Sequence, residues 1–344
     1  MLRYLSLALS GTFLMVLVAL RWLDAWWEGP LNVAEEGLIV YVEPGDSLSR
    51  LSRRLADAGV LDHERLFNWA GRFLGADSRI RLGEYRLEPG VTPASLLAQL
   101  QSGDTVRYLV TLPEGITLGE ALKLLADSKG IKPVLEGPQD SRLLDLVAPA
   151  TLTEGYFLPE TYQYERGDSD FDILHEAHRM MEEALVEVWG QRQQGLPYRD
   201  PYDALIMASI IEKETGLARE RAAIGGVFVR RLRSGMRLQT DPTVIYGLGA
   251  TFEGNLTRKH LSDEKNAYNS YRHKGLPPGP IALPGKAALM AAVNPEAGDA
   301  LYFVARGDGS HQFSASLKEH EAAVRQFQLS RRADYRSAPK SNEP

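Results

Sequence analysis

The sequence predicts an α+β protein made of an N-terminal transmembrane helix, a small α+β module and a larger mixed α+β domain. Three observations predict it. The first stretch of about 20 residues is almost wholly apolar, short strands then alternate with helices up to residue 125, and long runs with helical spacing dominate after residue 170. The length of 344 residues is enough for two or three domains, and 24% charged with 44% hydrophobic residues is ordinary for a globular protein.

The composition excludes several classes of function. A net charge of −6 gives no general attraction for nucleic acid, so no nucleic-acid partner is expected. The chain has no cysteine, which rules out disulfides, thiolate metal sites, a cysteine nucleophile and a lipid anchor on cysteine.

The N-terminus is predicted to be a membrane anchor. The run from Tyr4 to Leu20 reaches the roughly 20 residues of a span only if Arg21 and Asp24 lie at the far interface, beside an aromatic belt of three tryptophans. The α-amino group and Arg3 favour a cytoplasmic N-terminus. Residues 1–28 are therefore expected to be a cytoplasmic tip and a transmembrane anchor. A cleaved signal peptide is the alternative, but the run is long for one and no small-x-small cleavage site follows it.

Residues 38–108 are predicted to form a small module that begins with the order strand, helix, helix, strand. After the first strand, Asp46 or Ser47 caps a helix whose leucines have helical spacing. The second helix is expected over about residues 62–74, with Phe73 on its inner face. This order and the Pro-Gly-Asp-Ser-Leu turn resemble a LysM-type glycan-binding module. An ordinary α+β packing module is the alternative.

A strand, a tight turn and a capped helix occur three times, starting near Tyr41, Tyr85 and Val110. Proline fixes φ, glycine permits a positive φ, and a hydroxyl or carboxylate caps the next helix. The period is irregular, so the repeat is not a solenoid.

The remaining chain is predicted as a mixed α+β domain over residues 109–335, followed by a disordered tail over 336–344. Its most distinct elements are three helices at about 171–189, 202–214 and 218–232, and a hairpin of 301–304 with 311–313.

Familiar catalytic motifs are absent from the sequence. His175 and His178 are three residues apart rather than the four of a zincin helix, so we expect a solvated helix face and no metal site. There is no Gly-x-Ser-x-Gly, Walker or dinucleotide motif, and no cofactor is expected.

Two carboxylates, Glu212 and Glu214, end the apolar helix. Residues two apart on a helix point about 200° apart, so only one can face a cleft. Both faces are apolar, but Glu214 lies in the last turn, where the helix dipole and desolvation raise a carboxyl pKa as a general acid requires. Glu212 is expected to form an ion pair with Lys213, Arg219 or Arg221.

Polar and aromatic loops follow this helix. Gln239, Thr240 and Asp241 could align sugar hydroxyls and acetamides, aromatic rings in residues 266–271 could stack on sugar faces, and the Pro-Gly segment 275–280 could form a stiff wall. Each stretch by itself could be an ordinary loop.

In combination these stretches resemble the YceG-like endolytic murein transglycosylases over nearly the whole chain. The resemblance rests on Ile210–Thr215, Met236–Gly247, Ala267–Tyr271, Gly275–Pro280 and Leu301–Val304. It implies a membrane-anchored lytic transglycosylase that cleaves the MurNAc-β-1,4-GlcNAc bond of nascent peptidoglycan and leaves 1,6-anhydroMurNAc ends. Glycan strands are then the substrate, and the bacterial inner membrane holds the chain with its catalytic domain in the periplasm. Peptidoglycan synthases become candidate partners.

The resemblance also assigns roles to residues. The catalytic glutamate of the family maps onto Glu214. Lysozyme-like lytic transglycosylases likewise end an apolar helix in Glu-Ser, where this chain has Glu214-Thr215, but their following Gly-Leu-Met-Gln segment is missing, so their subsites do not carry over. Candidates for binding the sugar are Gln239, Asp241, Tyr246, Asn269, Tyr271 and, more weakly, Glu220, for which an ion pair with Arg231 is the alternative.

Two other functions fit the same residues. A hydrolytic muramidase would use Glu214 as the acid and Asp241 or Glu220 to activate water. A non-catalytic peptidoglycan-binding scaffold would hold Glu214 in a structural ion pair.

Overall fold

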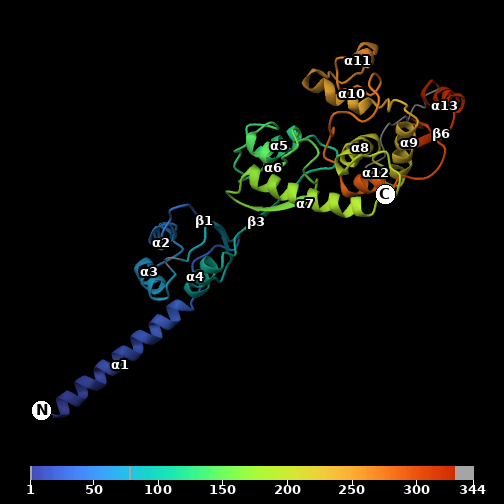
Figure 1. The fold of residues 1–344 in the computed structure, drawn as a ribbon. Coiled ribbons are helices and arrows are strands. Elements are labelled where there is room, and N and C mark those ends of the chain that lie inside the picture. The colour runs from blue at the N-terminus through green and yellow to red at the C-terminus, as the bar shows by residue number, and fades with distance from the viewer. Residues whose placement is uncertain (1, 77–78, 330–344) are drawn as a thin grey trace. The chain divides into compact units, whose positions relative to one another are not determined.

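The computed structural model describes residues 2–76 and 79–329, and the chain divides into two compact units (Figure 1). The first unit is Met1–Tyr108 with Gln163–Gly167, and the second is Leu109–Tyr162 with the chain from Asp168 onward. The segment 163–167, which the sequence placed in the second domain, thus belongs to the first unit. The tail predicted over 336–344 lies outside the described residues.

The first unit begins with a long helix and continues with a two-stranded sheet and three helices. In chain order these are α1 (Leu2–Trp27), β1 (Leu38–Val42), α2 (Leu48–Asp57), α3 (Glu64–Phe73), β2 (Gly83–Leu87) and α4 (Pro93–Ser102). β1 and β2 are antiparallel, with Leu38 opposite Leu87 and Val42 opposite Gly83. The predicted order strand, helix, helix, strand is confirmed.

Local capping explains where these helices begin. The Ser47 hydroxyl accepts from the backbone N–H of Arg50 at 3.3 Å and caps α2, as one of the two predicted alternatives required. Thr92 caps α4 in a reciprocal capping box with Ser95. Their buried leucines form one core together with Phe67 and Tyr85.

The expectation for Phe73 was wrong, because its side chain is 77% exposed. The inner face of α3 is made by Phe67 and Gly71, and a Cβ at Gly71 would lie only 2.1 Å from a methyl group of Leu48. Phe73 follows Gly71 by two residues, about 200° around the helix, and therefore points outward.

The second unit is mainly helical. Its main elements are α5 (Leu118–Ala126), α6 (Ser141–Leu146), α7 (Asp170–Gly190), α8 (Pro201–Glu214), α9 (Arg221–Arg233), α10 (Asp241–Leu248), α11 (Arg258–Ser262), α12 (Lys286–Val293), β5 (Tyr302–Ala305), β6 (His311–Ser314) and α13 (Leu317–Val324). The predicted helices near 171, 202 and 218 are confirmed, the third with a 3-10 turn at Ala218–Glu220. The predicted hairpin is the antiparallel pair β5 and β6. One further pair, β3 (Arg107–Thr111) with β4 (Thr161–Glu165), is cut by the division between the units.

The core of this unit surrounds α8. Every residue from Asp203 to Ile211 is buried, and α8 packs against α7, α9 and α12 (Figure 1). The contact between α9 and α12 is close, since a Cβ at Gly225 would lie 2.8 Å from the carbonyl oxygen of Ala291. This packing fixes the C-terminal end of α8 in place.

Candidate active site

Helix α8 is held at its start and stops at Glu214. The Asp200 side chain accepts hydrogen bonds from the N–H groups of Tyr202 and Asp203, and Pro201 occupies the first turn, where its missing N–H costs nothing. At the other end Thr215 adopts an extended conformation (φ −146°, ψ 135°). Glu214 is therefore the last helical residue, as the sequence predicted.

Glu214 borders a cavity of about 450 Å³ in the second unit. The wall comes from α8, α9, the segment before α10, the β5 strand and α13, so segments over 100 residues apart meet there. The lining residues are Glu214, Arg231, Leu238, Gln239, Thr240, Asp241, Tyr271, Tyr302, Phe303, Val304, Leu317, His320 and Val324.

The surroundings of Glu214 favour its protonated form. Burial is the main cause that raises the pKa of its carboxyl, to about 7, and the charge of Asp241 adds to it. The Thr240 hydroxyl donates to Glu214 Oε1, and this hydrogen bond and the charge of Arg231 act in the opposite direction. The carboxyl can thus give up and take back a proton near neutral pH.

Thr240 and Asp241 are themselves fixed. The Thr240 N–H donates to the Ser270 hydroxyl at 3.0 Å, and its carbonyl accepts from the Thr243 hydroxyl at 2.8 Å. Asp241 accepts from the Tyr271 hydroxyl at 2.7 Å. Burial raises the pKa of Tyr271, with the hydrogen bond to Asp241 as the next cause, so the phenol stays a donor.

Gln239 stands at the cavity with a backbone conformation that non-glycine residues seldom adopt, with φ at +52°. Its N–H donates to the Ser270 carbonyl at 3.2 Å, and its side chain is exposed. Strain of this kind persists where the surrounding structure imposes it, often at ligand sites.

The cavity residues that were not predicted as site residues include Arg231, Tyr302 and His320. Arg231 is buried and donates to the carbonyls of Leu301 and Leu238, each at 2.6 Å. Its guanidinium lies 5.1 Å from the ring centre of Tyr302, which in turn stacks on His320 at 5.1 Å. Tyr302 lies in Leu301–Val304, one of the stretches that carry the family resemblance, but that stretch indicated no site role, and no motif marks His320. Only the tertiary fold brings the C-terminal hairpin to α8.

The alternative carboxylate, Glu212, has a structural role. Its Oε1 accepts from Arg221 at 2.9 Å and its Oε2 accepts from the N–H of Gly285 at 2.9 Å. One of the predicted ion pairs, that with Arg221, is confirmed. Although burial raises its pKa, Glu212 does not line the cavity of Glu214.

Glu220 and Tyr246 lie outside this cavity. Glu220 is buried and bonds to His311, with its Oε2 2.7 Å from the ring nitrogen Nδ1, so the expected ion pair with Arg231 was wrong. Tyr246 donates to Glu154 at 3.2 Å, and burial raises the pKa of that carboxyl to about 7.

Asn269 is also outside the cavity and is fully buried. Its amide donates to three backbone carbonyls, including that of Asp263 at 2.8 Å, and its oxygen accepts from the N–H of Tyr271 at 3.1 Å. These bonds satisfy the hydrogen-bonding groups of the Asn269 side chain, so Asn269 stabilises the loop that holds Tyr271 at the cavity.

His175 and His178 on α7 were both expected on a solvated helix face, and this is confirmed for His175 alone. His175 is exposed, but His178 is buried and its Nδ1 lies 3.1 Å from the carbonyl oxygen of Tyr156, so a solvated face was wrong for it. His178 shares the inner face of α7 with Leu174 and Met181, at helical spacing. Within the described ranges, no group of three or more His, Asp or Glu side chains could hold a metal ion.

Comparisons with known proteins identify the family of this chain. The model of a family described as YceG-like matches residues 40–326. A Bacillus subtilis protein named endolytic murein transglycosylase is 30% identical over 306 residues, which is 84% of this chain and 84% of that protein. A Streptococcus pneumoniae protein of the same name is 24% identical over 319 residues, 83% of this chain and 57% of that protein. A crystal structure of a YceG-like protein from Listeria monocytogenes is 30% identical, has a TM-score of 0.53, and matches 84% of this chain and 99% of its own. The chain belongs to the YceG-like family.

Proposed function

We propose that this chain is an endolytic murein transglycosylase. It cleaves the MurNAc-β-1,4-GlcNAc bond of nascent peptidoglycan strands, leaves 1,6-anhydroMurNAc ends and so terminates glycan elongation. The observation that carries the proposal is a single carboxyl, Glu214, with a pKa raised to about 7 at the edge of a cavity of about 450 Å³. The names of the relatives from Bacillus subtilis and Streptococcus pneumoniae support the substrate and the reaction.

In the first step Glu214 acts as the acid. It donates its proton to the glycosidic oxygen while the bond from that oxygen to C1 of MurNAc breaks. The 2-acetamido oxygen of the same sugar can stabilise C1, as in substrate-assisted glycosidases. Because Thr240 donates to Oε1, the proton of Glu214 belongs on Oε2.

In the second step the ionised Glu214 acts as the base. It takes the proton from the O6 hydroxyl of MurNAc, and O6 forms its bond to C1. The anhydro ring closes, Glu214 is protonated again, and no water is consumed. One carboxyl with a pKa near 7 can serve both steps because it gives and accepts a proton at similar cost.

The remaining candidates then take separate roles. Gln239, Asp241 and Tyr271 line the cavity and are in place to bind sugar hydroxyls and acetamides. Tyr246 and Asn269 do not line the cavity: Tyr246 donates to Glu154, and Asn269 accepts from the N–H of the lining residue Tyr271.

We also propose that α1 is a retained single-pass anchor of the inner membrane, with its N-terminus in the cytoplasm and the catalytic unit in the periplasm. Leu9–Trp27 is long and apolar enough to cross a membrane. Trp26 and Trp27, at its end, pack against the core of the first unit, which a cleaved signal peptide would not need to do. An N-terminal reporter fusion that is active only outside the cytoplasm would overturn this topology.

The module of β1, α2, α3 and β2 is proposed to bind glycan in a LysM-like manner, a role that its order of elements supports. Titration of the labelled protein with chitooligosaccharide should shift the amide resonances of the turn 43–47. Shifts confined to the second unit would contradict this role.

The reaction itself is tested by product analysis. Purified glycan strands are digested with the parent protein, with Glu214→Gln and with Glu187→Gln, a matched change at an exposed position of α7. We expect the parent and Glu187→Gln to give 1,6-anhydro ends by mass spectrometry and Glu214→Gln to be slower by about 10²–10⁴-fold while folding normally.

Two outcomes separate the alternatives. Reducing ends in place of anhydro ends would identify a hydrolytic muramidase. Full activity of folded Glu214→Gln, or binding of strands without any cutting by the parent, would favour a scaffold.

A further inference from the structure

Helix α3 and Leu74, the residue that follows it, carry large apolar side chains that are exposed. Trp69 is 60% exposed, Phe73 77% and Leu74 52%. The rings of Trp69 and Phe73 stack on each other at 5.6 Å, one helical turn apart. Contiguous apolar surface of this kind marks an interaction site rather than scattered surface residues.

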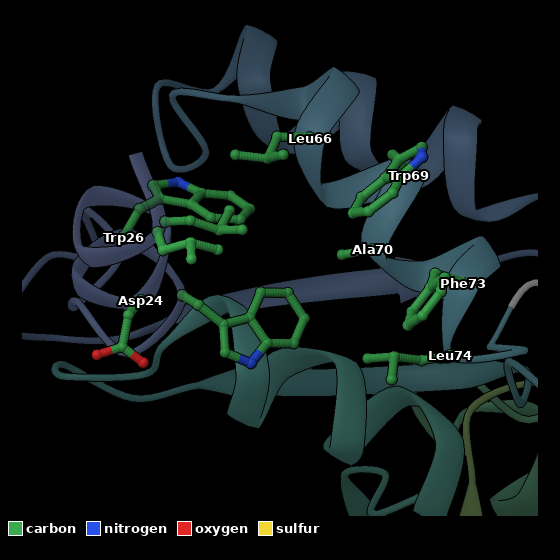
Figure 2. Close-up of a pocket in the computed structure, with 10 residues that line it drawn as sticks. Asp24, Trp26, Leu66, Trp69, Ala70, Phe73 and Leu74 are labelled. Atoms are coloured by element: carbon green, nitrogen blue, oxygen red, sulfur yellow. The ribbon is translucent and has the colours of Figure 1, made fainter. Parts of the chain in front are cut away.

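This surface is continuous with the end of α1. A cavity of about 330 Å³ is bordered on one side by α1, from Leu20 to Trp27, and on the other by α3. Figure 2 shows Trp69 and Phe73 across this cavity from Trp26. Lipid that surrounds the C-terminal end of α1 would therefore also contact the exposed side chains of α3.

The position of the cavity along α1 corresponds to the membrane interface. Leu9–Trp27 is 19 residues long, or roughly 28 Å at 1.5 Å per residue, close to the thickness of the hydrocarbon core. The lining residues of α1 begin at Leu20, about 10 Å before Trp27 along the helix. The exposed side chains of α3 thus lie level with the last part of the span, where tryptophan is favoured.

Two exposed arginines of α3 lie beside these side chains, whereas the α1 side of the cavity carries Asp24. Arg65 and Arg72 are both exposed on α3, four residues before and three residues after Trp69. Arginine beside exposed aromatic rings on a helix is typical of segments that lie in the headgroup layer.

The position of α3 relative to α1 is fixed. Trp26 and Trp27 pack on the core that α3 shares, and the ring of His63, just before α3, lies 5.4 Å from Trp22 and 6.1 Å from Trp26. Because the two helices are joined in this way, α3 cannot leave the interface while α1 spans the membrane.

We propose that α3 is a second membrane contact, which inserts Trp69, Phe73 and Leu74 into the interface of the leaflet that α1 enters last, with Arg65 and Arg72 among anionic headgroups. The proposal rests on α1 as a retained membrane span. It makes the first unit a module seated on the bilayer surface rather than one tethered above it.

Single cysteines test this directly, since the chain has none of its own. The full-length Phe73→Cys variant is labelled with an environment-sensitive fluorophore and reconstituted into vesicles that contain phosphatidylglycerol. The acyl chains of these vesicles are brominated, so that they quench a fluorophore that contacts them. Ile39→Cys, an exposed apolar position on β1 of the same unit, is the matched control. Phe13→Cys, exposed within α1, reports whether the span is in the bilayer.

We expect the Phe73 label to lose emission to brominated lipid by an amount between that of the Phe13 label and the near-zero loss of the Ile39 label. Strong loss at Phe13 with equal losses at Phe73 and Ile39 would overturn the α3 contact and leave the anchor intact. No loss at Phe13 would overturn the anchor and this contact together.

Two further arms exclude other occupants and test the charges. Energy transfer between labelled Phe73→Cys copies, without loss of emission to brominated lipid, would show that a second copy covers this face and would overturn the proposal.

Replacement of both Arg65 and Arg72 by Gln tests the charges. It should reduce the loss of emission from the Phe73 label in anionic vesicles and leave that loss unchanged in neutral vesicles. An unchanged loss in both kinds of vesicle would overturn the role of anionic headgroups.

Discussion

At the scale of single residues, the proton of Glu214 is controlled by its nearest neighbours. Burial is the main cause of the raised pKa, the Asp241 carboxylate raises it further, and the Thr240 hydroxyl lowers it by favouring the charged form. Both neighbours belong to one short segment that Ser270 holds in place. The sequence of this segment therefore sets the pH range in which the proposed acid step works.

Substitutions of these two neighbours should move the pH profile in opposite directions. The acid step needs protonated Glu214, so the rate falls as pH rises through its pKa of about 7. Asp241→Asn removes a cause that raises this pKa and should move the alkaline limb down by about half to one pH unit, whereas Thr240→Val should move it up by a similar amount. Profiles of kcat/KM on purified glycan strands measure both, with Glu187→Gln as the unshifted reference. Shifts of the same sign would contradict control of Glu214 by these neighbours.

The sequence showed that only one of Glu212 and Glu214 can face a cleft, because residues two apart on a helix point about 200° apart. The preference for Glu214 rested on its place in the last turn and on the family resemblance, and the catalytic role of Glu214 stays a prediction. The sequence was not sufficient for Tyr246 and Asn269. Their side chains look free in a loop, yet their partners come from distant segments or from the backbone of the folded loop. Which polar group meets ligand and which meets protein depends on tertiary contacts that no local spacing encodes.

At the scale of elements, the approach of α9 to α12 determines how α8 is supported. Gly225 permits this approach, since a Cβ there would meet the Ala291 carbonyl oxygen at 2.8 Å. The backbone of α12 at Ala291 cannot move away from such a Cβ as a flexible side chain would.

Gly225→Ala should therefore destabilise the second unit, although alanine is the better helix former. We expect a loss of roughly 1–3 kcal/mol in the free energy of unfolding, measured by urea denaturation. Gly190→Ala is the matched control, because Gly190 is the last residue of α7 and a Cβ there meets no atom within 4 Å. It should be neutral or more stable by about 0.5–1 kcal/mol. Equal effects at the two positions would exclude close packing as the cause.

Capping residues and apolar spacing predicted α2 and α5, and apolar spacing alone predicted α3 and α9, which have no side-chain cap. Helices α10 and α12 were not predicted. Ser47 and Thr117 mark the starts of α2 and α5 in the sequence itself. α12 has the sequence KAALMAAV, apolar on nearly all sides, and shows no period because it is buried among other helices. α10 begins within a Gln-Thr-Asp-Pro segment that looks like a loop.

At the scale of the whole molecule, the end of α1 and the rest of the first unit share one core. The sequence predicted a span over residues 1–28 and a module from residue 38, with residues 29–37 as a short linker between them. In the structure Leu31 is buried, its N–H donates to the Val91 carbonyl at 2.7 Å, and Trp26 and Trp27 pack against the module. Composition indicated the apolar run of α1 but could not show that Trp26 and Trp27 at its end pack against the module.

Loss of this shared packing should loosen the first unit alone. In full-length protein in lipid nanodiscs, Trp26→Ala with Trp27→Ala removes two half-buried indoles from the core, at a cost of about 2 kcal/mol or more. Hydrogen exchange followed by mass spectrometry should then show faster exchange of the β1 and β2 amides and unchanged exchange in α8, which belongs to the other unit. Phe13→Ala, exposed on α1 away from the module, should change neither. If the double variant left β1 and β2 as protected as in the parent, the last turn of α1 would not be part of the module, and a segment removed after export would explain the apolar run better than a retained anchor.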